Sequence, residues 1–313
     1  MLTDIITNQR LAWKSKTFKS DKDFTLDLRG ETLEELKKLS PEMAINLNSS
    51  KFWILSAFPN LQNDVENFKL NFLDTGYGFG LIKGLNSKDF SKEAQTNIYW
   101  LIENILGTPL SQNINGEKLV VVKDEGKKME EGGRYHHTRQ GGSYHTDSPQ
   151  WSNAPDYLGL LCYHHAWRGG ESKLLSVYSV HNRLLKADSN LLKVLYSPFH
   201  FDKRGEFKEK ESPTTLEPIF KHENGNLYFR YLRNYIDAGH EVSKKPLTKK
   251  QIQALKFLDE VLLDEKLVIS MRMHSGDVQY LNNHRIVHGR TAFTDFKDKD
   301  KKRVMLRSWV KRA

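Results

Sequence analysis

Short stretches of alternating apolar and polar residues characterise the chain from residue 119 onward. Successive side chains of a β-strand point to opposite faces, so this alternation is typical of strands with one buried face. The pattern predicts strands at Leu119–Lys123, Ser143–Asp147, Tyr157–His164, Ser172–Ser176, Leu227–Leu232, Leu267–Met271, Val278–Leu281 and Val304–Val310. Apolar residues at helical spacing predict two helices among them, at Val177–Lys186 and Lys249–Leu263. About eight strands with long connections favour a mainly β fold around a double-stranded β-helix, or jelly roll, with flanking helices.

The first third of the chain mixes extended and helical patterns. It predicts short strands at 23–28 and 78–83 and helices at 31–39, 60–73 and 90–106. No repeat, low-complexity tract or Pro/Gly-rich linker interrupts the chain, so we expect a single domain over 1–313. Its parts would be an α/β N-terminal flank at 1–118 and a jelly-roll core at 119–313. The polar, poorly periodic stretch 201–218 predicts a lid insertion over the barrel mouth, near residues 201–240.

Composition limits the classes of protein to which the chain can belong. Of 313 residues, 38% are hydrophobic and 28% are charged, as in a globular protein with a core. The net charge of +9 would suit a nucleic-acid-binding protein, but the basic residues are spread along the chain and form no zinc-finger or basic-zipper pattern. We therefore expect no nucleic-acid partner. A basic pocket for an anionic small molecule, or a merely soluble surface, explains the charge better.

Cys162 is the only cysteine, so no intrachain disulfide can form, which fits a reducing compartment. The first residues lack the apolar core of a signal peptide, and no run of about 18 apolar residues predicts a membrane span. We expect a cytoplasmic protein without a membrane partner. The sequence leaves the oligomeric state open.

One short motif, His145-Thr146-Asp147, carries candidate chemistry. On a strand, residues two apart share a face, so His145 and Asp147 would point into the barrel and Thr146 outward. His288 would supply a third ligand from a distant strand. Two histidines and one carboxylate can occupy one face of an octahedral metal and leave three positions open, as in non-haem Fe(II) oxygenases. The alternative is a hydrogen-bonded pair at 145 and 147 with an ordinary core histidine at 288.

The adjacent pairs His136-His137 and His164-His165 predict no metal site of their own. Neighbouring side chains on a strand diverge, so neither pair can chelate one metal. We expect these histidines to face solvent or to support other residues. The chain also lacks the paired cysteines of a structural zinc module.

Arg303 and Arg307 form a second candidate group. Their spacing of four is even, so both point inward if 304–310 is a strand. Guanidinium groups inside a pocket need anions, because burying an unpaired charge is costly. The anions could be protein carboxylates. They could instead be a dicarboxylate co-substrate and an anionic substrate.

With these motifs the chain resembles the taurine dioxygenase (TauD/TfdA-like) family of Fe(II)- and 2-oxoglutarate-dependent oxygenases, within the clavaminate-synthase-like superfamily with its cupin-like core. The resemblance runs from about Gly76 to Trp309 and depends on the order and spacing of several segments together. These segments are 76–85, 144–147, 169–172, 282–290 and 303–309.

The resemblance implies that His145, Asp147 and His288 bind Fe(II) and form the catalytic centre. It places Ser172 where the family usually has a threonine that hydrogen-bonds the distal carboxylate of 2-oxoglutarate, and Arg303 where an arginine pairs with that carboxylate. Arg307 corresponds to a second arginine, near the substrate or the inner carboxylate. The alternative for Ser172 is a strand serine on the solvent face.

The implied activity is O2-dependent hydroxylation of an unactivated C–H bond, with release of succinate and CO2. In related halogenases a small residue replaces the carboxylate that Asp147 supplies here, so halogenation is not expected. Two alternatives stay open: desaturation or ring formation in natural-product tailoring, and a non-catalytic protein that binds metal and 2-oxoglutarate.

The substrate should be a small molecule, either anionic or amino-acid-like. Candidate pocket residues lie after the triplet and near residue 235, and the alternative for each is a structural or surface role. They are Gln150, Trp151, Arg230 and Arg233.

Overall fold

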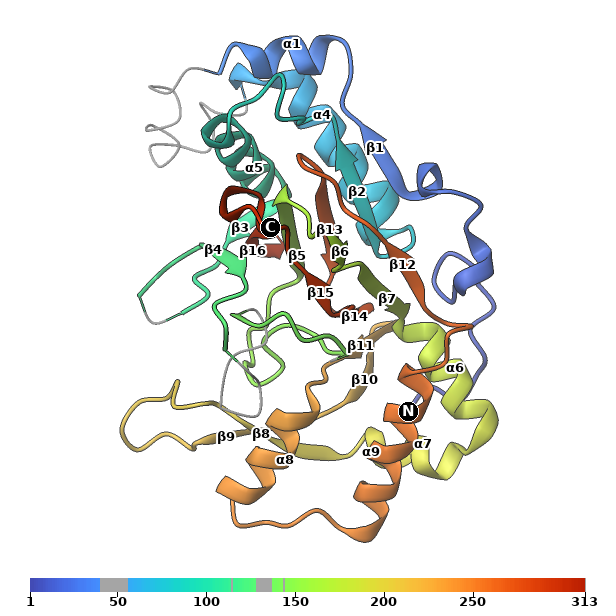
Figure 1. The fold of residues 1–313 in the computed structure, drawn as a ribbon. Coiled ribbons are helices and arrows are strands. Elements are labelled where there is room, and N and C mark those ends of the chain that lie inside the picture. Colours follow the sequence, from blue (N-terminus) through green and yellow to red (C-terminus); the bar gives the residue numbers. More distant parts are fainter. Residues whose placement is uncertain (40–55, 114, 128–136, 143, 313) are drawn as a thin grey trace.

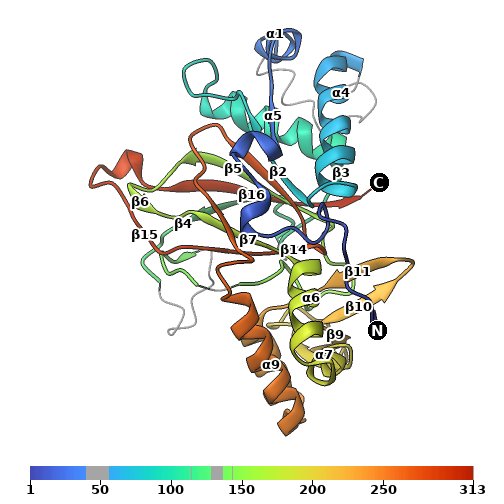
Figure 2. The ribbon, with the colours of Figure 1, turned by 90° about the vertical axis from the view of Figure 1, so that its right-hand side faces the viewer.

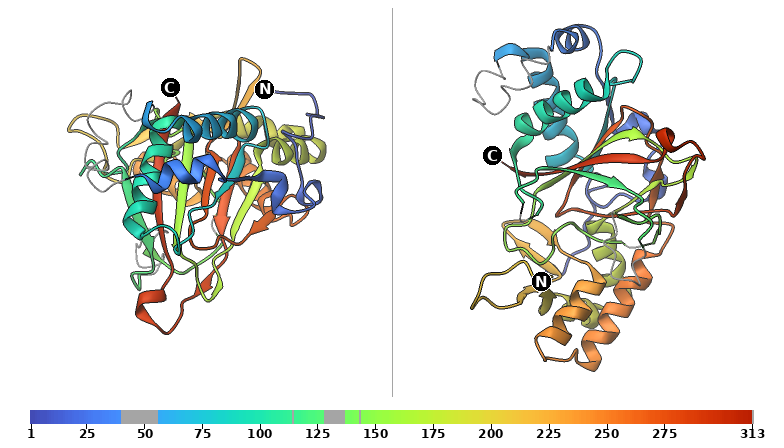
Figure 3. Two further views of the ribbon diagram at one scale, coloured as in Figure 1. Left: turned by 90° about the horizontal axis from the view of Figure 1, so that it is seen from above. Right: turned by 60° about the vertical axis from the view of Figure 1, so that its left-hand side comes forward.

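Two β-sheets packed face to face form the centre of the protein, between two layers of helices (Figure 1). The computed structural model describes residues 1–39, 56–113, 115–127, 137–142 and 144–312. One helical layer covers the larger sheet and comprises α1 (Glu31–Lys37), α4 (Pro59–Phe68), which continues into a π-helix at Lys69–Asp74, and α5 (Lys92–Leu106). The other layer lies beyond the smaller sheet and comprises α6 (Val177–Ala187), α7 (Ser189–Leu195), α8 (Arg233–Val242) and α9 (Lys249–Leu262). Figures 2 and 3 show the same layers from other sides.

The larger sheet is mixed and has seven strands within the described residues, in the order β1-β2-β13-β5-β16-β3, with β4 also paired to β16. Its strands are β1 (Thr25–Asp27), β2 (Phe79–Lys83), β3 (Gly107–Pro109), β4 (Leu119–Lys123), β5 (Tyr157–His164), β13 (Val278–Asn282) and β16 (Val304–Arg312). Only β1 and β2 run parallel. The register of β16 against β5 shifts between Val304 and Met305.

The smaller sheet is antiparallel and consists of β12 (Ile269–Met271), β7 (Ser172–Ser176) and β14 (Ile286–Arg290). Three short pairs accompany it. These are β6 (Arg168–Gly169) with β15 (Phe293–Thr294), β8 (Pro198–Asp202) with β9 (Thr214–Pro218), and β10 (Phe220–Glu223) with β11 (Asn226–Phe229). The last pair turns at Asn224-Gly225, where φ is 49° and 74°, the left-handed values that such tight hairpins require.

The alternation along β5 explains how the layers hold together. Leu158 and Cys162 face the space between the two sheets, whereas Tyr157, Leu161 and Tyr163 face α4 and α5. A third apolar cluster joins the smaller sheet to α6, α7 and α9. Burying both faces of a strand removes much apolar surface from water, and this burial is the main force that stabilises the sandwich.

The structure confirms the predicted mainly β architecture with flanking helices and a jelly-roll core. The helices predicted at 177–186 and 249–263 correspond to α6 and α9. Among the elements that were not predicted are α7, α8 and the β8–β9 hairpin. Residues 201–240, interpreted as a lid insertion, include β9 and the β10–β11 hairpin. Among the described residues, no helix has both the length and the apolar character needed to cross a membrane.

Candidate active site

Three side chains that can bind a metal meet between the two sheets. The Nε2 atoms of His145 and His288 each lie 3.4 Å from Asp147 Oδ1, and the candidate ligand atoms all lie within 4.8 Å of one another. His288 is on β14. His145 forms an isolated bridge with it, in which each backbone N–H donates to the other's carbonyl at 2.9 Å. Backbone pairing therefore brings the two distant parts of the chain together.

The prediction of a strand at 143–147 is wrong for the described part of that segment. Only His145 makes a β-bridge, and Ser143 lies outside the described residues. Thr146 does not face solvent but is buried, and it exchanges two hydrogen bonds with the backbone of Tyr231. Consecutive residues thus pair with different partners, which ends the ladder after one residue.

Asn283 fixes the backbone of Asp147, the third candidate ligand. Its side-chain oxygen accepts the N–H of Asp147 at 2.9 Å, and its side-chain nitrogen donates to the Asp147 carbonyl at 3.0 Å. The next residue, Ser148, has a φ of 53°, so the chain turns sharply away from the site. These bonds position the Asp147 carboxylate without a regular strand.

The second carboxylate oxygen of Asp147 is held from β16. Trp309 Nε1 donates to Oδ2 at 2.6 Å, and Arg307 Nη1 lies 3.3 Å from the same oxygen. Arg307 Nε in turn donates to Gln112 Oε1 at 2.8 Å. Burial would raise the pKa of Asp147, but Arg307 and the two histidines outweigh it and hold that pKa well below its usual range. Asp147 is therefore an anion whose Oδ1 faces the histidines.

His288 is suited to bind a metal as a neutral imidazole. Burial and the neighbouring His145 lower its pKa, although Asp147 acts in the opposite direction. Neutral histidine and an ionised carboxylate are the forms that coordinate first-row metals. Two imidazoles and one carboxylate around a common point fit Fe(II), with other positions left for further ligands.

A small cavity adjoins the three side chains and contains the other residues expected at the site. Ser172, Arg303 and Arg307 all line it, together with the triad. Its volume is about 70 Å³. The serine does not face bulk solvent, because Ser172 Oγ donates to Gln279 Oε1 at 3.2 Å. Both Arg303 and Arg307 line the cavity, although Arg303 lies just before the first residue of β16.

Sequence reasoning missed two polar residues of this cavity, Gln279 on β13 and Arg290 on β14. Arg290 lies two residues after His288, so the period of a strand would have placed both on one face. Its guanidinium donates to two backbone carbonyls and lies 4.9 Å from the ring centroid of Phe293, while that of Arg303 lies 5.1 Å from the same ring. No comparable spacing relative to a candidate residue could have identified Gln279 from the sequence.

The four candidates for substrate contact separate into two groups. Gln150 and Trp151 line a second, larger cavity. Arg230 donates to the carbonyls of Pro149 and Trp151 at 3.1 and 3.3 Å, so it braces that segment. Arg233 forms ion pairs with carboxylates of α8 and α9, on the helical layer.

Of the paired histidines, His136 lies outside the described residues, and none of His137, His164 and His165 lines the triad cavity.

Comparison with known proteins agrees with this geometry. Residues 58–309 match the model of the Taurine catabolism dioxygenase TauD, TfdA family. The chain belongs to this family. FR-33289 synthase of Streptomyces rubellomurinus is a TauD relative that is 32% identical over 244 residues, covering 76% of this chain and 70% of that protein.

Solved structures share the TauD fold of this chain. An asparagine oxygenase in complex with Fe(II), a hydroxyasparagine and succinate aligns with a TM-score of 0.68 and 18% identity, over 92% of this chain and 93% of that one. The non-haem iron oxygenase OrfP with Fe and α-ketoglutaric acid aligns with a TM-score of 0.66 and 17% identity, over 92% and 94%. As a TauD-family member, the chain is a non-haem iron oxygenase that uses 2-oxoglutarate and O2.

Proposed function

We propose that the protein hydroxylates an unactivated C–H bond of a small anionic or amino-acid-like molecule, with release of succinate and CO2. His145, Asp147 and His288 would hold Fe(II). The observation that carries this proposal is the convergence of two histidines on one oxygen of Asp147, while Trp309 and Arg307 hold its other oxygen. Such support from neighbouring residues orients a metal ligand.

The residues of the small cavity supply the co-substrate site. Arg303 would pair with the distal carboxylate of 2-oxoglutarate, and the Ser172 hydroxyl, which now donates to Gln279, would donate to the same carboxylate. Arg307 orients Asp147 and adds positive charge beside the inner carboxylate. Bound Fe(II) would supply O2 activation coupled to decarboxylation of 2-oxoglutarate. The apolar walls at Leu158 and Leu160 exclude water from the site.

The amino-acid-like substrate is supported by the neighbouring structures, which were solved in complex with a hydroxyasparagine, a hydroxy-L-Arg or L-Arg. The basic residues of the chain also favour an anionic group on the substrate. Retention of Asp147 in the triad favours hydroxylation over halogenation.

The test is formation of succinate from 2-oxoglutarate in the presence of Fe(II) and O2. His145→Ala and Asp147→Ala should abolish it, whereas His222→Ala, which changes an exposed histidine on β10, should not. Normal turnover in both triad variants would overturn the assignment. A protein that binds iron and 2-oxoglutarate but forms no succinate would instead be a non-catalytic binder. Loss of two hydrogen atoms from the substrate, instead of gain of oxygen, would identify a desaturase or cyclase.

A further inference from the structure

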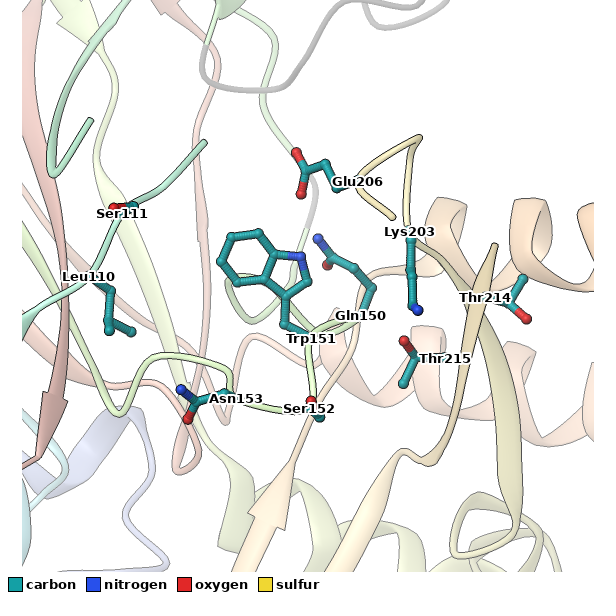
Figure 4. Close-up of a pocket in the computed structure, with 10 residues that line it drawn as sticks. All are labelled: Leu110, Ser111, Gln150, Trp151, Ser152, Asn153, Lys203, Glu206, Thr214 and Thr215. Carbon is teal, nitrogen blue, oxygen red and sulfur yellow. The ribbon is translucent and has the colours of Figure 1, made fainter. Parts of the chain in front are cut away.

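A second cavity of about 490 Å³ lies between the segment that follows Asp147 and the β8–β9 hairpin (Figure 4). This volume is in the range of about 300–1,000 Å³ that is typical of small-molecule sites. The triad cavity measures about 70 Å³. At roughly 10–15 Å³ for each water-sized group, it holds about five to seven such groups, too few for a co-substrate and a second organic molecule together. A substrate therefore needs the larger cavity.

Aromatic contacts join the larger cavity to the triad. Trp151 lines the cavity, and its ring packs edge-on against Trp309 with the centroids 5.7 Å apart. Trp309 donates its indole N–H to Asp147. Leu110 also lines the cavity, and its backbone N–H donates to the Trp309 carbonyl at 2.8 Å. Trp151 therefore connects the cavity to Trp309, and Trp309 in turn holds the Asp147 carboxylate.

Gln150 provides the observation that indicates a ligand. Gln150 is only 5% exposed, and among the described residues no group donates a hydrogen bond to its Oε1. A buried amide oxygen without a partner destabilises a fold, so it needs an explanation, and a bound ligand that donates a hydrogen bond supplies one. Arg230 donates to the carbonyls of Pro149 and Trp151, on both sides of Gln150, so the backbone that carries this amide is held in place.

Charges of both signs line the same cavity. Figure 4 shows the Gln150 amide and the Trp151 ring near its centre, with the Glu206 carboxylate above them and the Lys203 ammonium beside Thr215. Lys203 is paired only loosely, with Glu211 at 4.0 Å. A small molecule with an ammonium group at one end and an acidic group at the other complements this arrangement.

We propose that this cavity is the substrate subsite and that it selects zwitterions, with Gln150 Oε1 and Glu206 binding the amino group and Lys203 binding the acidic group. The proposal rests on the proposed function, since the bound molecule must present its C–H bond to the triad. Gln150 is here a specificity residue, and Trp151 lines the side of the subsite that packs against Trp309.

The experiment measures succinate formation with a panel of probes: the proteinogenic L-amino acids and aminoalkyl sulfonates and phosphonates. Each probe is paired with the analogue that lacks the amino group and with the analogue that lacks the acidic group. At least one zwitterion should stimulate succinate formation, and each of its two analogues should stimulate roughly tenfold less or weaker still. If analogues that lack one charged group stimulate turnover and no zwitterion does, or if the deaminated analogues stimulate it as well as the zwitterions, the proposal is overturned.

Substitutions at Gln150 and Lys203 test whether these two residues contact the substrate. Gln150→Leu should raise the KM of the stimulating zwitterion roughly tenfold or more, and Gln150→Glu, which keeps the acceptor, should raise it less. Lys203→Met should also raise that KM, with recovery in Lys203→Arg. Gln253→Leu, at an exposed glutamine of α9, is the matched control. Unchanged KM in both Gln150→Leu and Lys203→Met would overturn the subsite. Failure of the proposed function is distinguishable, because the wild-type protein would then form no succinate with any probe.

Discussion

The indole N–H of Trp309 donates to Asp147 Oδ2 at 2.6 Å. This bond occupies the carboxylate oxygen that faces away from the two histidines and leaves Oδ1 toward them. The two residues come from distant parts of the chain, so the orientation of the carboxylate is a property of the assembled sheets.

Trp309→Phe should weaken binding of Fe(II) by roughly 10–100-fold, because loss of such supporting hydrogen bonds typically has this effect on metal affinity. The measurement is a titration of the protein with Fe(II) without oxygen, or with Co(II) as a spectroscopic substitute. Trp167→Phe is the control, since Trp167 is 57% exposed. Equal affinities in the two variants would show that the indole hydrogen bond does not orient the ligand.

Arg303→Ala should raise the KM for 2-oxoglutarate by roughly 30–150-fold, as expected for loss of a charge-assisted pair worth about 2–3 kcal/mol. Arg303→Lys should recover part of this loss, because lysine keeps the charge but not the planar fork. Steady-state kinetics at varied 2-oxoglutarate provide the measurement. Arg183→Ala, at an exposed arginine of α6, is the control. An unchanged KM in Arg303→Ala would remove this residue from the co-substrate site.

Glu103 on α5 should make the stability of the protein depend on pH. Burial raises the pKa of this carboxyl to about 7, although hydrogen bonds from Ser308, Tyr280 and Tyr99 oppose the shift. Because the folded state binds this proton more tightly than the unfolded state, stability should fall as pH rises from about 4.5 to about 7. The loss amounts to roughly 3 kcal/mol at full ionisation.

Glu103→Gln should remove this dependence. Denaturant unfolding of both proteins at low and high pH measures it, and Glu93→Gln, at an exposed position of the same helix, is the control. The free energy of unfolding of Glu103→Gln should change less with pH than that of the wild type. Parallel pH profiles would contradict the assignment of the raised pKa to Glu103.

Gly159→Ala should destabilise the protein by about 1–3 kcal/mol, the usual effect of overpacking a core. A Cβ at this position of β5 would lie 2.5 Å from Ser308 Oγ and from the Tyr99 hydroxyl, and 2.7 Å from Glu103 Oε1. Thermal or denaturant unfolding measures the change. Adding Ser308→Ala should restore part of the lost stability, because it removes one of the clashing atoms. No recovery in the double variant would place the strain elsewhere.

The sequence by itself determined the fold class and the main candidate residues of the site. Period-two alternation is a local property of strands, so β4, β5, β7 and β16 could be located from residue patterns alone. The triplet at His145, the distant His288 and the two arginines formed a recognisable order along the chain, and that order led to the family. The structure places all of them around one cavity.

Only the tertiary structure showed what holds those residues in place. The segment at His145 is not a strand, and its geometry depends on Tyr231 and Asn283, which lie far away in the sequence. The same holds for Trp309 and Gln112, whose hydrogen bonds fix Asp147 and Arg307. Periodicity describes which way a side chain faces along one segment, but it carries no information about which segments become neighbours. For that reason the larger cavity and the buried amide of Gln150 appeared only when the hairpin and the segment after Asp147 were placed together in space.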